Sequence, residues 1–274
     1  MRTEAGPLEL DRIDLADIDD PERLAQALHR QLGATDAPVP VVEIARALDI
    51  VDVRLHPLDG LEGALVTDAV RSYGVIAANT SRGSRRARFT VAHELGHFLM
   101  ERHRPTTEDG FACRGSDMRE TRAGTRHQRQ EMEANRFAIS ALAPPRMVAP
   151  FLREDPDLGR VGELAKTLDI SREAAARRYV DLHDQLLAVV WSVGGVVRYS
   201  VRNERFPWLE VSGGNRLSGI TPAASAVAQG RRGVTRMTET SPAAWIGSRE
   251  VELFEQTRVG RDGHASDAAL GRDA

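Results

Sequence analysis

Apolar residues recur every three or four positions in some parts of the chain and alternate with polar residues in others, the spacings of half-buried helices and strands. In the N-terminal half these patterns predict the following elements: helices over residues 21–32 and 41–48, strands over 50–55, 63–66 and 73–77, a helix beginning near Thr90, and a helix from Gln130 that ends at Pro144. We therefore expect a small sheet packed against helices.

The C-terminal half has different patterns. Residues 161–182 predict two helices joined by a tight turn, which resembles a helix-turn-helix. The other predicted elements are a hairpin of strands over residues 186–201 that turns at Gly194 and Gly195, strands over 208–211, 233–239 and 251–257, and a helix over 222–229. We expect residues 259–274 to form a flexible tail.

Composition narrows the class of protein. The chain has 274 residues, 41% of them hydrophobic and 28% charged, which is typical of a soluble protein with more than one domain. It has no apolar run long enough to span a membrane and no signal-peptide core near its start, so we expect a cytoplasmic protein with no membrane partner. Cys113 is the single cysteine, which excludes an internal disulfide. The net charge of −3 argues against a wholly electrostatic nucleic-acid binder.

The sequence R-F-T-V-A-H-E-L-G-H-F-L-M places His93, Glu94 and His97 in an H-E-x-x-H motif within an apolar, helix-forming run. Residues four apart lie on one face of a helix, about 5–6 Å apart between Cβ atoms, so both imidazoles can bind one cation. Glu94 beside them can take a proton from water, the role that this motif gives its glutamate in metallopeptidases. The motif predicts a metal-dependent hydrolase.

A catalytic zinc site usually has three protein ligands, and the sequence offers several candidates for the third. His103 has the spacing of the longer motif H-E-x-x-H-x-x-G-x-x-H, but Met100 stands where that motif has its glycine hinge. In the second helix, Glu131 and Glu133 flank the apolar stripe on opposite sides, so periodicity alone leaves open which carboxylate faces the metal.

The two segments R-F-T-V-A-H-E-L-G-H-F-L and E-M-E-A-N-R-F-A-I-S-A-L-A-P resemble the signature of the ImmA/IrrE metallo-endopeptidases, whose members share R-F-T-x-A-H-E-L-G-H and E-A-N-x-F-A-x-x-L-x-P. The chain departs from the signature at Ala143, where a methionine is usual, and in the long segment between the two motifs. The resemblance implies Zn2+ as cofactor, His93, His97 and Glu133 as its ligands, and Glu94 as the catalytic base.

The same resemblance implies a function. It suggests a zinc-dependent endopeptidase whose substrate is a helix-turn-helix transcriptional repressor, and whose cleavage releases a stress, phage or mobile-element response. The alternative is a DNA-binding or scaffold regulator with a structural or relic zinc site. DNA contact would fall to arginines of the helix pair, Arg172, Arg177 and Arg178.

These observations combine into an α+β fold with four parts. We predict a zincin-like metallopeptidase domain over residues 1–150, a helix-turn-helix-like unit over 151–185, an α+β sensor or recognition domain over 186–258, and the tail over 259–274.

The polar segment 104–129 joins the two metal-bearing helices and is long for a helix connection, so it is a candidate lid. Cys113 lies within it, and its thiolate could occupy a fourth zinc position; the alternative is an ordinary unpaired cysteine. Candidates for a donor that stabilises the transition state are Tyr73, His127 and Arg136.

Overall fold

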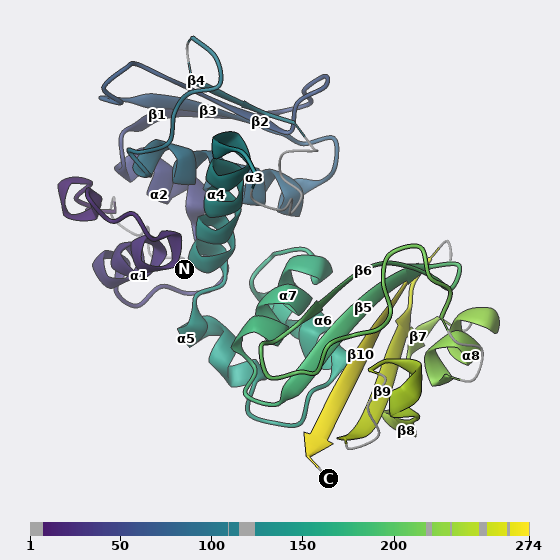
Figure 1. The fold of residues 1–274 in the computed structure, drawn as a ribbon. Helices are drawn as coiled ribbons and strands as arrows, with labels where there is room; N and C mark the ends of the chain where they lie inside the picture. Colours follow the sequence, from purple (N-terminus) through teal and green to yellow (C-terminus); the bar gives the residue numbers. More distant parts are fainter. Residues whose placement is uncertain are drawn as a thin grey trace, which may run out of the picture. The chain divides into compact units, whose positions relative to one another are not determined.

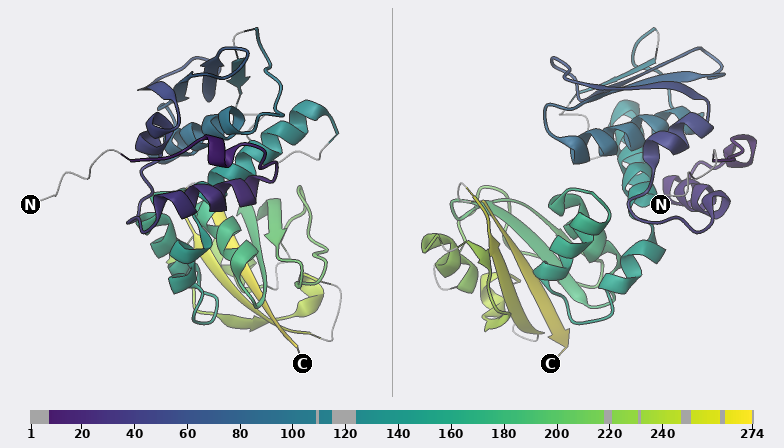
Figure 2. Two further views of the ribbon diagram at one scale, coloured as in Figure 1. Left: turned by 90° about the vertical axis from the view of Figure 1, so that its left-hand side faces the viewer. Right: turned by 180° about the vertical axis from the view of Figure 1, so that it is seen from behind.

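A computed structural model gives the fold of the protein (Figure 1, Figure 2). The structure describes residues 8–108, 110–114, 124–217, 221–230, 232–246, 251–261 and 264–273. Contacts between residues divide the chain into two compact units. The first comprises Met1–Met147 with Thr167–Ser171, and the second comprises Val148–Lys166 with Arg172–Ala274.

The first unit is built on a four-stranded sheet with the strand order β1-β3-β2-β4. Its strands are β1 (Ile50–His56), β2 (Gly63–Thr67), β3 (Gly74–Asn79) and β4 (Gly110–Cys113). β1 and β3 are parallel, whereas β2 is antiparallel to β3 and to β4. β4 therefore forms one edge of the sheet, and β2 is its ladder partner among the described strands.

Helices lie on one side of this sheet (Figure 1). α2 (Val41–Ala47) and α3 (Ser84–Leu99) pack against the strands, α4 (Arg126–Leu142) packs against α3, and α1 (Pro21–Leu32) packs against α4. Leu65, Ile76 and Ala78 point to the helical side and are completely buried, while Val51 and Leu55 are more than half exposed. The core of the unit thus lies between the sheet and α3.

The predicted elements up to Asn79 are confirmed, with bounds that differ from the expected ones by at most two residues. The start of α3 is a correction. The helix begins at Ser84, and Thr90 lies inside it with its hydroxyl donating to the carbonyl of Arg86. Arginine is a good helix former, so the arginine-rich segment before Thr90 extends the helix by more than a turn.

A glycine sets the distance between α3 and α4. A Cβ atom at Gly96 would lie 2.9 Å from Cδ1 of Phe137 and 3.4 Å from Cα of Ala134, so a larger residue there would push α4 away. The α4 residues Ala134, Phe137 and Ala138 are fully buried, as their helical spacing predicts. This packing holds the two helices that carry the motif residues close together.

The second unit is built on a six-stranded antiparallel sheet with the order β6-β5-β10-β9-β7, in which β8 also pairs with β9. Its strands are β5 (Leu186–Val193), β6 (Val196–Arg202), β7 (Gly233–Val234), β8 (Thr238–Thr240), β9 (Val251–Val259) and β10 (His264–Asp273). The helices α5 (Pro145–Val148), α6 (Leu158–Thr167), α7 (Arg172–Leu182) and α8 (Pro222–Ala228) complete the described helices.

Two predictions for the C-terminal half are wrong. Residues 259–274, expected as a flexible tail, contain β10, which lies inside the sheet and pairs with both β5 and β9. The strand is rich in alanine, which is depleted in strands, so its strand pattern is weak. The two neighbouring strands supply hydrogen bonds along its length. Residues 208–211 are not a strand.

The helix pair α6 and α7 is grouped with the C-terminal sheet, apart from the turn at Thr167–Ser171. Two of the three arginines of α7 predicted for DNA contact lie against protein. Arg177 stacks over the rings of Tyr199 and Trp191, at 5.1 and 5.8 Å from their centroids. Arg178 is buried and pairs with Asp181. The third, Arg172, is exposed at the start of α7.

No helix in the described part of the chain combines the length and apolar character that crossing a membrane requires.

A buried carboxyl group lies in the middle of the second sheet. Asp267 of β10 is 1% exposed and stands opposite Thr257 of β9. Burial raises the pKa of Asp267 to about 8; a hydrogen bond from Thr257 opposes the shift, and the neighbouring Glu255 adds to it. The folded protein therefore holds a proton that the unfolded chain releases above its ordinary pKa of 3.8.

Because the folded-state pKa is the higher one, the second unit should lose stability as the pH rises from about 4 to about 8. We expect Asp267→Asn to raise its free energy of unfolding at pH 7 by at least about 1 kcal/mol, with a gain that vanishes towards pH 4. Denaturant unfolding followed by tryptophan fluorescence measures this unit alone, because Trp191, Trp208 and Trp245 all lie in it. The exposed Glu252→Gln is the control, and a destabilised Asn variant at pH 7 would contradict the prediction.

Candidate metal centre

The motif residues of α3 point into the interior of the first unit. His93, Glu94 and His97 are all completely buried. The two histidines, one helical turn apart, bring their Nε2 atoms to 3.1 Å from each other. A cation that accepts a lone pair from each of the two Nε2 atoms would fit between such buried imidazoles.

Helix α4 adds a carboxylate to this pair. The two oxygens of Glu131 lie 3.2 Å from Nε2 of His93 and 3.3 Å from Nε2 of His97. Neither oxygen meets a donor in hydrogen-bonding geometry among the described residues, although Glu131 is only 2% exposed. Donor atoms bound tetrahedrally at about 2.0–2.1 Å from zinc stand roughly 3.3 Å apart, so the three residues fit a zinc ion.

The charge states also suit a cation. Burial lowers the pKa of His97 to about 4, so its imidazole is neutral near neutral pH. Burial opposes ionisation of Glu131, but the close His93 and His97 outweigh it and hold the pKa of the carboxyl well below its usual range. Neutral imidazole and ionised carboxylate are the forms that bind metal.

Asn135 fixes the orientation of His93. Its side-chain oxygen accepts a hydrogen bond of 3.0 Å from Nδ1 of His93, which leaves the lone pair on Nε2 facing the other ligands. Asn135 lies one helical turn after Glu131, so one helix both supplies a ligand and orients another. This gives the E-A-N part of the motif a physical role.

A chain of hydrogen bonds orients His97 in the same way. Nδ1 of His97 donates to Nδ1 of His103 at 2.9 Å, and Nε2 of His103 donates to Glu133 at 2.9 Å. Arg102 pairs with the same carboxylate at 3.0 Å. With this proton order, each imidazole is a single tautomer, and Nε2 of His97 is left as an acceptor for the metal.

The third ligand implied by the family resemblance differs from the arrangement in the structure. Glu131, and not Glu133, reaches the two histidines; Glu133 is 27% exposed and contacts the site through His103. Residues two positions apart in a helix point about 200° apart around its axis. Glu131 and Glu133 therefore cannot face the same side of α4. Glu131 shares its side with Ala134 and Ala138, which pack against α3.

His103, the alternative ligand, is also outside the group of donor atoms. It lies against the Nδ1 side of His97, whereas the group forms on the Nε2 side. α3 ends at Leu99, and the chain turns through Met100 in an extended conformation with φ −81° and ψ 92°. The reversal thus brings His103 beside His97 without the glycine hinge, as a hydrogen-bond partner.

Glu94 lies beside the group and on the sheet side of α3. A Cβ atom at Gly63 of β2 would lie 2.6 Å from Oε1 of Glu94, so this glycine makes room for the carboxylate. Burial raises the pKa of Glu94 to about 7, while His93 and a hydrogen bond from the Cys113 thiol oppose the shift. A carboxyl with such a pKa can both accept and donate a proton near neutral pH.

Cys113 is the fourth member of the group. The donor atoms of His93, His97, Glu131 and Cys113 all lie within 4.8 Å of one another, and every one of these residues is buried. The sequence placed Cys113 in a loop, and the structure places it at the end of β4. A strand of four residues is too short for periodicity to reveal. Much of the candidate lid, residues 109 and 115–123, lies outside the described residues.

One of the three candidate donors lies near this group. His127, one turn before Glu131, is partly exposed and has its Nδ1 3.6 Å from that carboxylate. Tyr73 is half exposed, and Arg136 pairs with Glu22 of α1 at 3.0 Å. Sequence alone could not rank them, because the helix face that meets the site was not known.

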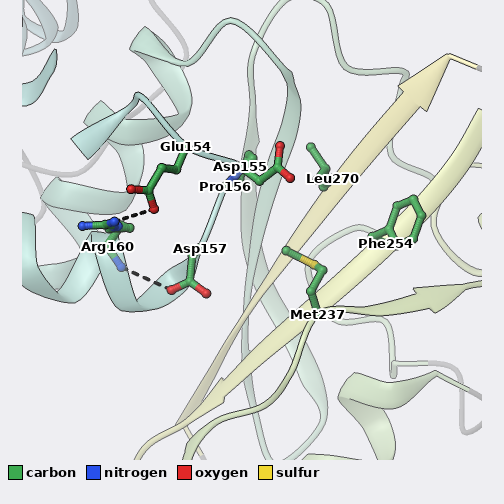
Figure 3. A pocket seen from close by; sticks show the side chains of 8 residues that line it. All are labelled: Glu154, Asp155, Pro156, Asp157, Arg160, Met237, Phe254 and Leu270. Atoms are coloured by element: carbon green, nitrogen blue, oxygen red, sulfur yellow. Dashed lines mark hydrogen bonds and ion pairs between the residues drawn. The ribbon is translucent and has the colours of Figure 1, made fainter. Parts of the chain in front are cut away.

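The second unit contains a cavity of about 860 Å³ (Figure 3). It is lined by Glu154, Asp155, Pro156, Asp157, Arg160, Met237, Phe254 and Leu270. Its charged groups already serve the fold, because Glu154 pairs with Arg160, and Asp157 accepts hydrogen bonds from the start of α6 and from Gln256. The chemistry of the molecule is therefore best sought at the histidine group.

An H-E-x-x-H helix that meets a carboxylate from a second helix under a small sheet defines the class of zincin-like metallopeptidases. Comparison with known proteins supports this class. Residues 48–179, just under half of the chain, match the family model of the IrrE N-terminal-like domain, so this region is similar to the ImmA/IrrE-type metallopeptidases.

Two individual proteins are similar to the chain. The radiation response metalloprotease IrrE of Deinococcus radiodurans is 31% identical over 127 residues, which make up 46% of this chain. The match spans only 35% of that relative's length. A Mycobacterium tuberculosis transcriptional regulator of known structure aligns with a TM-score of 0.56 at 16% identity, over 96% of this chain and 79% of that chain. This second likeness is one of fold.

The positions of Glu131 and Glu133 lead to a prediction about metal affinity. We expect Glu131→Gln to weaken zinc binding by more than 100-fold, because it removes a charged ligand, and Glu133→Gln to weaken it by about 10-fold through His103. Competition with a chromophoric chelator measures both affinities, and circular dichroism checks that both variants are folded. A larger loss in the Glu133 variant would show that Glu133 is the ligand.

Proposed function

We propose that the first unit is a zinc-dependent endopeptidase domain. The observation that carries this proposal is the buried group of donor atoms beside the carboxyl of Glu94. The Nε2 atoms of His93 and His97 lie 3.1 Å apart, and Oε2 and Oε1 of Glu131 lie 3.2 and 3.3 Å from them, respectively. A structural zinc site has no need of such an adjacent carboxyl, whereas hydrolysis of a peptide bond requires a base next to the metal.

His93, His97 and Glu131 would hold the ion, and Asn135 and His103 would keep the two imidazoles in the tautomer that binds it. Zinc at this position would polarise the scissile carbonyl and lower the pKa of water. Glu94 takes a proton from the attacking water on its carboxylate and delivers it to the nitrogen of the leaving amine. Its pKa of about 7 suits both transfers.

His127 is suited to stabilise the negative charge that develops on the carbonyl oxygen. Its ring lies one helical turn from Glu131 and is 43% exposed, so it can approach a substrate from the solvent side of the site. An imidazole donor aimed at a developing oxyanion is a common element of hydrolase sites.

The substrate that we propose is a helix-turn-helix transcriptional repressor in the cytoplasm, whose cleavage would start a stress, phage or mobile-element response. Support comes from the family, from a relative described as a radiation response metalloprotease, and from a structural neighbour described as a transcriptional regulator.

The competing function is a DNA-binding or scaffold regulator with a relic zinc site. Two of the three arginines predicted for DNA contact give it little support, because Arg177 lies on Tyr199 and Trp191, and Arg178 is buried. Arg172 is exposed, and it is a single cation. The basic residues before the motif are likewise occupied. Arg82 and Arg86 pair with Glu62, and Arg85 and Arg88 pair with Asp169.

Replacement of Glu94, the proposed base, tests the proposal that the protein is a peptidase. We expect Glu94→Gln to reduce repressor cleavage by about 10²–10⁴-fold, because the carboxylate that moves the proton is lost, while zinc stays bound. Co-expression with the repressor encoded nearby, followed by zinc-dependent cleavage on gels and by a reporter of derepression, measures the effect. The matched control is Glu101→Gln on the same segment, which is exposed.

If derepression persists in the Glu94→Gln variant at full zinc occupancy, the protein acts by binding, and the peptidase proposal is wrong. If the protein cleaves an unrelated unfolded protein but does not cleave the repressor, the peptidase proposal stands and the proposed substrate is wrong.

A further inference from the structure

Cys113 lies where the attacking water of a metallopeptidase would have to be. Its Sγ belongs to the donor group of His93, His97 and Glu131, and its thiol also donates to the carboxyl of Glu94. The sulfur atom of Cys113 thus lies close both to the proposed metal ligands and to the proposed base, Glu94. Cys113 is 1% exposed, so it is packed into this position by the fold.

We propose that Cys113 is a fourth ligand that closes the metal site and keeps the peptidase latent. The inference rests on the function proposed above, and it adds a mode of regulation to the same site. Zinc sites with four protein ligands are structural and closed, whereas catalytic zinc sites leave one position for water. With Cys113 bound, the set His93, His97, Glu131 and Cys113 is of the closed kind.

The donor set is chemically consistent. Two imidazoles, a carboxylate and a thiolate are all zinc ligands, and a zinc–sulfur bond is about 2.3 Å long. The buried, unsatisfied oxygens of Glu131 point independently to a cation in this group. A thiol loses its proton when it binds a metal. Because Cys113 also contacts the carboxyl of Glu94, a bound sulfur would stand against the base as well.

The position of Cys113 at the end of an edge strand makes its release feasible. β4 has four residues, and its register runs from Val66 opposite Gly110 to Gly63 opposite Cys113. Strand ends open at lower free-energy cost than central strands. Opening of this strand end would draw Cys113 away from the metal and admit water.

Cobalt substitution tests the ligand directly. Co2+ bound by a thiolate shows a near-ultraviolet charge-transfer band, which histidine and carboxylate ligands do not give. We expect the band in the Co2+-loaded wild-type protein and its loss in Cys113→Ala. The control is a double variant, Cys113→Ala with Ala112→Cys, because neighbouring residues of a strand point to opposite faces and the displaced thiol cannot reach the metal.

A second measurement needs no variant. Cys113 is the single cysteine of the chain, so alkylation by iodoacetamide reports on this thiol alone. We expect zinc to slow alkylation at least 10-fold relative to the metal-free protein. No band with cobalt, or equal alkylation rates with and without zinc, would overturn the proposal that Cys113 is a ligand.

Activity tests latency. We expect Cys113→Ala to cleave its substrate at least 10-fold faster than the wild type at equal zinc occupancy. If the cobalt band is present but the variant is no faster, Cys113 is a ligand without a regulatory role, and the latency proposal is wrong. If neither protein cleaves any substrate, the proposed function fails, while the cobalt band still decides whether Cys113 binds the metal.

Discussion

The close packing of α3 against α4 is the constraint on which the candidate site depends. Gly96 allows the two helices to approach at the level of Phe137, and this approach brings Glu131 to 3.2 and 3.3 Å from the Nε2 atoms of His93 and His97. A side chain at Gly96 would separate the helices by more than a metal site tolerates. The same glycine stands inside the H-E-x-x-H motif, so the motif encodes its own packing surface.

Around this contact the fold builds a layer of hydrogen bonds that prepares the ligands. Asn135 orients His93, and the chain from His97 through His103 to Glu133 orients the other imidazole. Such partners raise the affinity of a metal site, because the ligands need no rearrangement on binding. The family resemblance implied Glu133 as a ligand. In the structure it is instead the hydrogen-bond partner of His103, which contacts the ligand His97.

The sheet of the first unit forms the surroundings of Glu94. Gly63 of β2 makes room for Glu94, and the neighbouring strand β4 delivers Cys113 to the same point. Two segments that are far apart in the sequence therefore meet at the base, one to accommodate it and one to contact it. If Cys113 binds the metal as proposed, the balance between an open and a closed site rests on this edge strand.

The sequence by itself determined the local features of this protein. Helical spacing predicted α1 to α3 and the apolar face of α4, and the H-E-x-x-H motif predicted the pair His93 and His97, because residues four apart share a face of any helix. The choice between Glu131 and Glu133, the role of His103, the contact of Cys113 and the strand β10 were decided by the tertiary structure. The choice of carboxylate depends on which face of α4 meets α3, and the strand β10 depends on the strands that flank it. Contacts between residues far apart in the sequence decide both features.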